Sequence, residues 1–167
     1  MTANYTGLID YVQYMNFATD EKSQSNVLRS PPASSRAVKA VMQANRWKDT
    51  KPEIILRKNL RKLGITGYRL YWPIPGRPDI AFPGRRICIL VQGCFWHRCP
   101  HCKLPLPRTN ADYWIEKFKR NTERDIRKER ERSDLGWITL VYWECEVLRD
   151  PFKIAMKIKE AIKLRPA

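Results

Sequence analysis

The feature that most restricts the fold of this chain is a group of three cysteines within nine residues, followed later by a fourth. The group is Cys94-x4-Cys99-x2-Cys102 with His101 inside it, and Cys145 comes directly after a strand predicted over 137–143. Thiolates and imidazoles at this spacing are the ligands of a closed tetrahedral zinc site. His101 and Cys102 compete for one ligand position, and a set of buried free thiols is the alternative to a metal.

The charge of the chain indicates the class of its partner. Lys and Arg number 32 against 17 Asp and Glu, which gives a formal charge of +15 and favours a polyanion. Hydrophobic residues make up 43% of the chain and six residues are Trp, so the charge lies on a chain that folds and not on a disordered basic tail. A length of 167 residues suits one domain and excludes a multidomain machine.

Two segments bear on the cellular compartment. The longest apolar run, Ile87–Val91, is far shorter than the roughly 20 residues of a membrane helix. Residues 1–14 lack the basic, apolar and small-residue pattern of a secretory signal. We therefore expect a cytoplasmic protein, in which the five cysteines are reduced and a metal is favoured over disulfides.

Residues 23–35 contain five Ser, two Pro and an Asn, a composition typical of a linker. We therefore predict an N-terminal extension and linker over 1–34 and a single domain over 35–167.

Hydrophobic spacing predicts alternating helices and strands in that domain. A capping box at Thr50–Glu53 and leucines at helical spacing predict a helix over 51–63. Short apolar or aromatic runs predict strands at 68–72, 80–82, 86–91 and 137–143, with Cys88 as a small buried residue in the third. Helical periodicity predicts two further helices: one over 110–133 with an apolar side of Trp114, Ile115, Phe118 and Ile126, and one from Asp150-Pro151 with a buried stripe of Phe152, Ile154, Ala155, Ile158 and Ile162. This order favours an α/β fold with a mixed central sheet flanked by helices.

Asp79 and His97 are the candidates for chemistry outside the cysteine group. Asp79 follows a Pro- and Gly-rich loop and begins a predicted strand, where a carboxylate can bind Mg²⁺. Nuclease sites of this kind often add an acid on the next strand, but residues 80–111 contain none. His97 follows that next strand and can transfer a proton near neutral pH. The alternatives are a turn aspartate and a packed or metal-bound imidazole.

Four motifs in this chain resemble, in order and spacing, those of the very-short-patch repair (Vsr) DNA mismatch endonucleases, which nick DNA beside a T:G mismatch. They are Pro75-Gly76-Arg77-Pro78-Asp79, Gly93-Cys94-Phe95-Trp96-His97, Asn121-x-Glu123-Arg124-Asp125 and Val141-x-Trp143-Glu144-Cys145. The resemblance covers about residues 35–149. It implies a restriction-endonuclease-like core with an embedded structural zinc, and so an endonuclease domain over 35–167.

The resemblance also implies catalytic roles. Asp79 resembles the ligand of the catalytic Mg²⁺, and Val91 stands where a main-chain carbonyl completes the ligation, which accounts for the missing acid. His97 resembles the catalytic histidine, and Glu53 and Asp125 match acidic positions near the active site. The capping box by itself also accounts for Glu53.

For the other sites, the resemblance implies zinc ligation by cysteines and DNA contacts by aromatic residues. The zinc ligands would be Cys94, Cys99, Cys102 and Cys145, with His101 as the substitute for Cys102. Phe95, Trp96 and Trp114 match residues that wedge into the base stack, with ordinary core packing as the alternative. Gln92 departs from the family, because relatives often have Asp or His there, so metal affinity or pH dependence is expected to differ.

The sequence therefore predicts a Mg²⁺-dependent endonuclease that nicks one strand beside a T:G mismatch arising from deaminated 5-methylcytosine. The basic helix over 117–132 would follow phosphates, with contacts from Lys117, Lys119, Arg120 and Arg124, unless its charges form only a solvated face. The alternatives are sequence-specific nicking without a mismatch, and an inactive zinc-stabilised DNA-binding adaptor. The expected partner is mismatched duplex DNA, bound by a monomer associated with the bacterial nucleoid, with general mismatch-repair proteins as further contacts.

Overall fold

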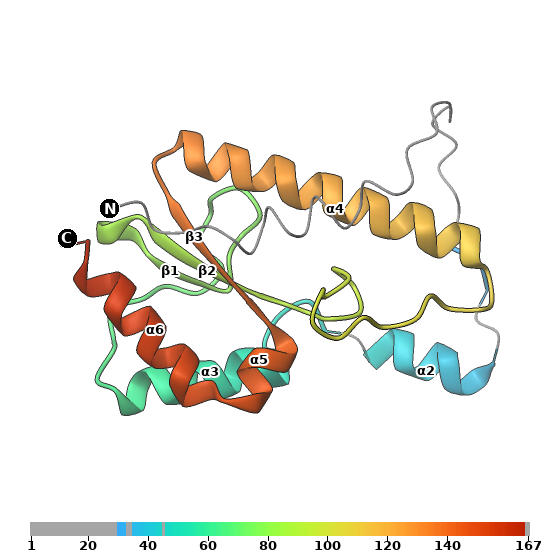
Figure 1. The fold of residues 1–167 in the computed structure, drawn as a ribbon, viewed down its shortest axis with the longest axis horizontal. Helices are drawn as coiled ribbons and strands as arrows, with labels where there is room; N and C mark the ends of the chain where they lie inside the picture. Colours follow the sequence, from blue (N-terminus) through green and yellow to red (C-terminus); the bar gives the residue numbers. More distant parts are fainter. Residues whose placement is uncertain (1–29, 33–34, 45, 166–167) are drawn as a thin grey trace.

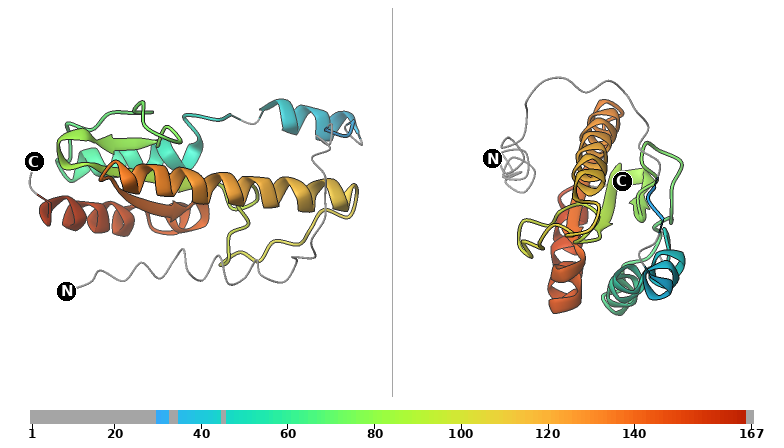
Figure 2. Two further views of the ribbon diagram at one scale, coloured as in Figure 1. Left: turned by 90° about the horizontal axis from the view of Figure 1, so that it is seen from above. Right: turned by 90° about the vertical axis from the view of Figure 1, so that its right-hand side faces the viewer.

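The computed structural model of the chain describes residues 30–32, 35–44 and 46–165. Within them a three-stranded sheet lies between helix α4 (Ala111–Asp134) on one side and helices α3 (Lys51–Lys62), α5 (Glu144–Arg149) and α6 (Pro151–Lys163) on the other (Figures 1 and 2). A further helix, α2 (Arg36–Ala44), precedes α3. This arrangement confirms the predicted α/β fold with a mixed sheet flanked by helices.

The strand order is β1-β2-β3, and the pairing of β2 with β3 is longer than that of β1 with β2. Strand β1 (Ile80–Phe82) runs antiparallel to β2 (Ile87–Gln92), and the short 3-10 helix η1 (Pro83–Arg85) joins them. Strand β2 runs parallel to β3 (Ile138–Trp143), and α4 lies in the crossover between them, as parallel strands require. The predicted strands at 80–82, 86–91 and 137–143 are confirmed to within one residue at each end.

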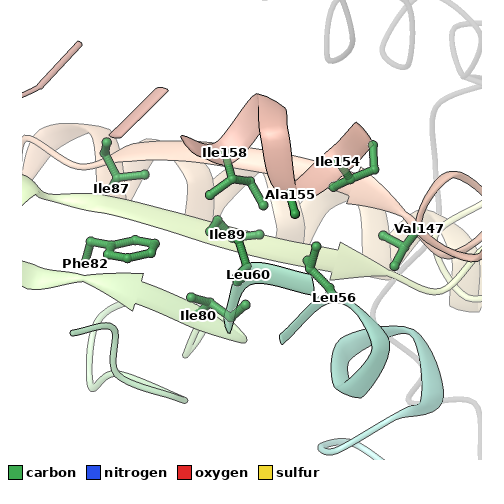
Figure 3. Packing of buried hydrophobic residues seen from close by; sticks show 10 residues of the cluster. All are labelled: Leu56, Leu60, Ile80, Phe82, Ile87, Ile89, Val147, Ile154, Ala155 and Ile158. Carbon is green, nitrogen blue, oxygen red and sulfur yellow. The ribbon is translucent and has the colours of Figure 1, made fainter. Parts of the chain in front are cut away.

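The core lies between the sheet and α3, α5 and α6, because alternate side chains of β2 point to opposite faces. Ile87 and Ile89 point toward this helical layer, whereas Cys88 points to the face covered by α4, where its Sγ lies 3.4 Å from Thr139 Oγ1. Cys88 is fully buried, as predicted. Figure 3 shows the cluster that fills the core, made of Leu56, Leu60, Ile80, Phe82, Ile87, Ile89, Val147, Ile154, Ala155 and Ile158.

The helices predicted at 51–63, 110–133 and from Pro151 are confirmed. At α3, the capping box forms between Thr50 and Glu53; at α6, the Asp150 carboxylate accepts a hydrogen bond from the Lys153 N–H. Two side chains predicted to be buried are not: Ile115 is 44% exposed and Phe152 is 52% exposed. Phe152 lies two residues before Ile154, which is only 4% exposed, so Phe152 points to the opposite side of α6.

The strand predicted at 68–72 is wrong. A single bridge joins Arg69 to Ala81, with both N–H···O distances 2.8 Å, and the pairing goes no further. Tyr71 has a φ of 51°, which is incompatible with an extended strand. Helices α2 and α5 were not predicted from the sequence, and they have only nine and six residues.

The predicted extension and linker over 1–34 lie almost wholly outside the described residues, so the domain division stays a prediction. In the part of the chain that the structure describes, none of the helices combines the length and apolar character needed to cross a bilayer.

Candidate active site and metal centre

Asp79 lies at the start of β1, beside the end of β2. Its Oδ2 accepts a hydrogen bond of 2.7 Å from the Val91 N–H. In an extended strand the N–H and C=O of one residue point to the same edge, so the Val91 carbonyl also faces the edge where Asp79 lies. The structure therefore brings the predicted carboxylate and main-chain ligands together, although they are 12 residues apart in the chain.

The environment of Asp79 makes its negative charge costly. Burial raises the pKa of Asp79 to about 7, the nearby Glu53 carboxylate raises it further, and the Val91 N–H opposes the shift. A carboxylate that is poorly solvated and close to a second acid is a position that a cation would stabilise. The chemistry of this donor set, a carboxylate with a main-chain carbonyl, fits the hard oxygen ligands of Mg²⁺.

Glu53 is only 4% exposed, and both of its oxygens are occupied. Oε1 accepts hydrogen bonds from the Thr50 N–H and hydroxyl, and Oε2 accepts from the Asp49 N–H at 3.0 Å and the Tyr71 hydroxyl at 2.9 Å. The capping role of Glu53 is therefore observed, while its role in catalysis stays a prediction. Its contribution to the site is the charge that it places near Asp79.

Sequence reasoning missed the neighbours of Glu53. Asp49 pairs with Arg57 through an Nη2–Oδ1 contact of 2.6 Å, which lowers the pKa of the Asp49 carboxyl. Tyr71 donates to Glu53 from a position 18 residues away, and burial raises its pKa far above the ordinary range. Asp49 could have been suspected as a neighbour of Glu53, because it directly precedes the capping box. Nothing in the sequence around Tyr71 indicates that it contacts Glu53.

His97 and Asp125 form a direct pair. His97 Nδ1 lies 2.5 Å from Asp125 Oδ2, with both side chains less than one quarter exposed. His97 comes from the segment after β2, whereas Asp125 lies midway along α4. A carboxylate on one ring nitrogen fixes the orientation and tautomer of an imidazole. Asp79, Val91, His97 and Asp125 line one open groove.

Three predicted DNA-contacting rings also gather together. Phe95 packs edge-on against Trp96, Trp114 and Phe118, with centroid distances of 5.1, 5.2 and 5.4 Å. Lys117 Nζ lies 5.4 Å from the centroid of the Trp96 ring and 5.3 Å from that of Trp114. Phe95 is thus the packed centre of this aromatic cluster, and Trp96 is the member that lines the groove.

The predicted basic contacts on α4 do not share one face. Arg124 lines the groove and Lys117 lies over the aromatic cluster. Arg120 is exposed and lies 3.6 Å from Glu116, within one turn of Lys117. Lys119 points away, because two residues of helix rotate the side chain by about 200°. The apolar side of α4 is also narrower than predicted, and its buried residues are Phe118, Thr122 and Arg132.

The cysteine group closes as predicted from its spacing. The Sγ atoms of Cys94, Cys99, Cys102 and Cys145 all lie within 4.8 Å of one another. Cys99 and Cys145 are 3.8 Å apart at sulfur, which matches the edge of a tetrahedron with Zn–S bonds of about 2.3 Å. The Cys145 N–H also donates to Cys94 Sγ at 3.4 Å, an interaction that favours a thiolate.

Cys102, not the exposed His101, is the residue that joins this group. Without a metal, burial raises the pKa of Cys145 to about 11 and that of Cys94 still higher. A divalent cation reverses this cost, because it holds the sulfurs as thiolates. The donor set therefore fits a structural zinc ion.

Comparisons with known proteins agree with the motifs. The family model for DNA mismatch endonuclease Vsr matches residues 33–104. The chain is 42% identical over 109 residues to the type II nicking enzyme V.XorIIP of Xanthomonas oryzae pv. oryzae, covering 64% of this chain and 79% of that enzyme. It is 43% identical over 115 residues to the type II nicking enzyme V.NaeI of Lentzea aerocolonigenes, covering 65% and 68%.

It is also 38% identical over 105 residues to the DNA mismatch endonuclease Vsr of Escherichia coli, covering 62% of this chain and 67% of that enzyme. The E. coli relative has the same name as the family model, and the alignments cover two thirds or more of each of these three relatives. The chain belongs to the Vsr family of DNA endonucleases.

Proposed function

We propose that this protein is a Mg²⁺-dependent endonuclease that nicks one strand of duplex DNA beside a T:G mismatch. The observation that carries the proposal is the groove in which Asp79, held against the Val91 main chain, lies with the His97–Asp125 pair. An inactive DNA-binding adaptor has no need of a desolvated carboxylate and a carboxylate-oriented histidine in one groove. This geometry favours an enzyme over an adaptor.

The catalytic roles follow from the positions of these groups. Asp79 and the Val91 carbonyl would hold the metal; Mg²⁺ supplies charge neutralisation at the phosphate and a more acidic bound water. Asp125 keeps His97 Nδ1 occupied, so proton transfer falls to the other ring nitrogen, Nε2. Glu53 keeps the field around Asp79 negative, which favours retention of a cation.

The aromatic cluster supports the choice of a mismatched site. A T:G wobble stacks less well than a matched pair, so opening it costs less, and an inserted ring recovers about 1–3 kcal/mol per base by stacking. Trp96 is the candidate wedge, because it lines the groove while Phe95 braces it edge-on. Lys117, Arg120 and Arg124 on α4 would contact phosphates, whereas Lys119 points to the other side of the helix.

The remaining parts of the proposal concern zinc and the surroundings of the protein. The four gathered cysteines would hold zinc in a structural role only. One groove suffices to cut one strand, which supports a monomer. A DNA substrate supports a place at the nucleoid of a bacterial cell, where general mismatch-repair proteins are candidate partners.

A second candidate function is nicking at a specific sequence without a mismatch. It is considered because the relatives from Xanthomonas oryzae and Lentzea aerocolonigenes are named type II nicking enzymes, a name that specifies nicking and mentions no mismatch. Aromatic wedges serve either function, so the geometry of the cluster does not separate them.

The test uses labelled duplexes that differ only in one T:G or T:A pair, with and without Mg²⁺. We expect a single nick in one strand beside T:G, dependent on Mg²⁺ and lost in Asp79→Asn. Asp134→Asn, an exposed acid at the end of α4, is the matched control and should cut at the parental rate. Equal cutting of T:G and T:A duplexes would favour the sequence-specific candidate, and no cutting of any duplex would contradict both.

A further inference from the structure

A buried arginine on α4 contacts the segment that leads into the active site. Arg132 is only 2% exposed. Its Nε donates to Thr139 Oγ1 on β3 at 2.9 Å, its Nη1 donates to the Pro75 carbonyl at 3.0 Å, and its Nη2 lies 2.6 Å from Glu129 Oε2. The guanidinium therefore joins α4, β3 and the loop before β1.

The contact at Pro75 lies where the loop has little freedom. Gly76 has a φ of +82°, and a Cβ at this position would meet Arg132 Nη1 at 2.7 Å. Arg77 follows with a φ of 43°, and Asp79 is the second residue after it. The loop backbone thus lies directly against the guanidinium, three residues before the catalytic carboxylate. Only Arg77 and Pro78 separate Gly76 from Asp79, so the position of the Gly76 backbone restricts where Asp79 can lie.

The same helix positions the other half of the site. Asp125, which holds His97, and Arg132 are seven residues apart, about two turns, so they lie on the same side of α4. One residue fixes the histidine and the other fixes the loop that carries the carboxylate. Because a helix is rigid over two turns, α4 sets the separation between these two halves of the groove.

We propose that Arg132 is a positioning residue of the nicking reaction. Its hydrogen bond to the Pro75 carbonyl would keep Asp79 at the correct distance from His97. This inference rests on the proposed function. It predicts that losing the guanidinium impairs metal use and turnover more than DNA binding, because Arg132 is buried and the proposed DNA-contacting groups are other residues. Misplacement of a reacting group by about 1 Å costs on the order of 100-fold in rate.

A purely structural role for Arg132 makes a different prediction. Arg132→Met and Glu129→Gln both weaken the buried ion pair and so lower stability, but only Arg132→Met removes the donor to Pro75. Arg132→Lys keeps a donor of similar reach and should partly restore turnover. Arg127→Met, the same substitution at a residue 66% exposed at its side chain on the same helix, is the matched surface control.

The experiment measures kcat, KM for the T:G duplex and the Mg²⁺ concentration for half-maximal nicking, on zinc-loaded proteins whose folding is checked by circular dichroism. We expect Arg132→Met to lower kcat by about tenfold or more and to raise the Mg²⁺ requirement, with KM for DNA within about twofold of the parent. Glu129→Gln and Arg127→Met should stay within about threefold of the parental kcat.

Gly76→Ala tests the same contact from the loop side and decides the matter if Arg132→Met does not fold. Its methyl group meets the guanidinium, so kcat should fall by about tenfold, and the combined variant should lose less than the product of the two single effects. Parental kcat in folded Arg132→Met, equal losses in Arg132→Met and Glu129→Gln, or strictly multiplicative effects would overturn the inference. Parental kcat in Gly76→Ala would overturn it as well. A parent protein that does not nick would instead overturn the proposed function on which it rests.

Discussion

Replacing Asp79 by Asn is expected to stabilise the metal-free protein while it abolishes nicking. The carboxyl holds its proton up to about pH 7 in the folded protein, mainly because burial disfavours the charged form, but only to about 3.8 in the unfolded chain. Between these values the folded state binds more protons than the unfolded state, so the free energy of unfolding falls as the pH rises. Asn carries no charge, and its Oδ1 can still accept the Val91 N–H.

The size of the expected change in the free energy of unfolding follows from the pKa shift of Asp79. A rise from 3.8 to about 7, at about 1.36 kcal/mol per pKa unit, sets an upper limit of about 4 kcal/mol on the cost of the charged carboxyl at pH 8.5. At pH 5.5 the same shift costs about 2 kcal/mol, because the folded state is still protonated. The stability advantage of Asp79→Asn over the parent should therefore grow by about 2 kcal/mol between pH 5.5 and 8.5.

The assay is urea unfolding of zinc-loaded protein in Mg²⁺-free buffer at both pH values, followed by Trp fluorescence. Asp134→Asn, which removes an exposed carboxylate, should change stability by less than about 0.5 kcal/mol at either pH. Added Mg²⁺ should stabilise the parent and not Asp79→Asn, since only the parent keeps the ligand. An advantage that is absent, or that does not grow with pH, would refute the argument from burial.

Three further predictions concern the metal centre and the DNA contacts. Elemental analysis should find one zinc ion per chain, and Cys145→Ser should lose zinc and stability, whereas Cys88→Ser, outside the group, should keep its zinc. Trp96→Ala should slow nicking of T:G duplex by about 10- to 100-fold at unchanged zinc content, as loss of base stacking implies; an unchanged rate would rule out the wedge. DNA affinity should fall steeply with salt, and Lys117→Met should weaken binding more than Lys119→Met, measured by fluorescence anisotropy; equal effects would contradict the assignment of faces on α4.

The sequence alone predicted those helices and strands whose residue pattern matches the face that they bury in the fold. The capping box and leucine spacing predicted α3, and the β-branched run predicted β2, because each pattern reports the face that the element buries. The fold is the restriction-endonuclease-like type expected for the Vsr family. The four cysteines were also predictable, since metal ligands must be specific residue types at restricted spacing.

Other features had no local signal. The Tyr71 hydroxyl reaches Glu53 across 18 residues, and the Arg132 guanidinium reaches Pro75 across 57. Neither Tyr71 nor Arg132 belongs to a sequence motif, and the strand wrongly predicted at 68–72 fails at the same Tyr71 that turns toward Glu53. The charged pattern of α4 likewise read as a solvated face, although Arg132 within it is buried. Contacts of this kind depend on the packed arrangement and not on the neighbouring sequence.

The metal centre and the active site share one segment, and this explains how a structural zinc can matter for catalysis. The chain from Gly93 to Cys102 contains neither helix nor strand, yet it carries Trp96 and His97 between Cys94 on one side and Cys99 and Cys102 on the other. Zinc ligation by Cys94, Cys99 and Cys102 would fix both ends of this segment to Cys145 at the start of α5, and Asn121 holds its middle through the Trp96 carbonyl at 3.0 Å. Asp79 depends on none of these contacts, because the β1–β2 pairing positions it. Loss of zinc would therefore displace the histidine and the wedge first and leave the carboxylate in place, while α4 still links the two halves of the site through Asp125 and Arg132.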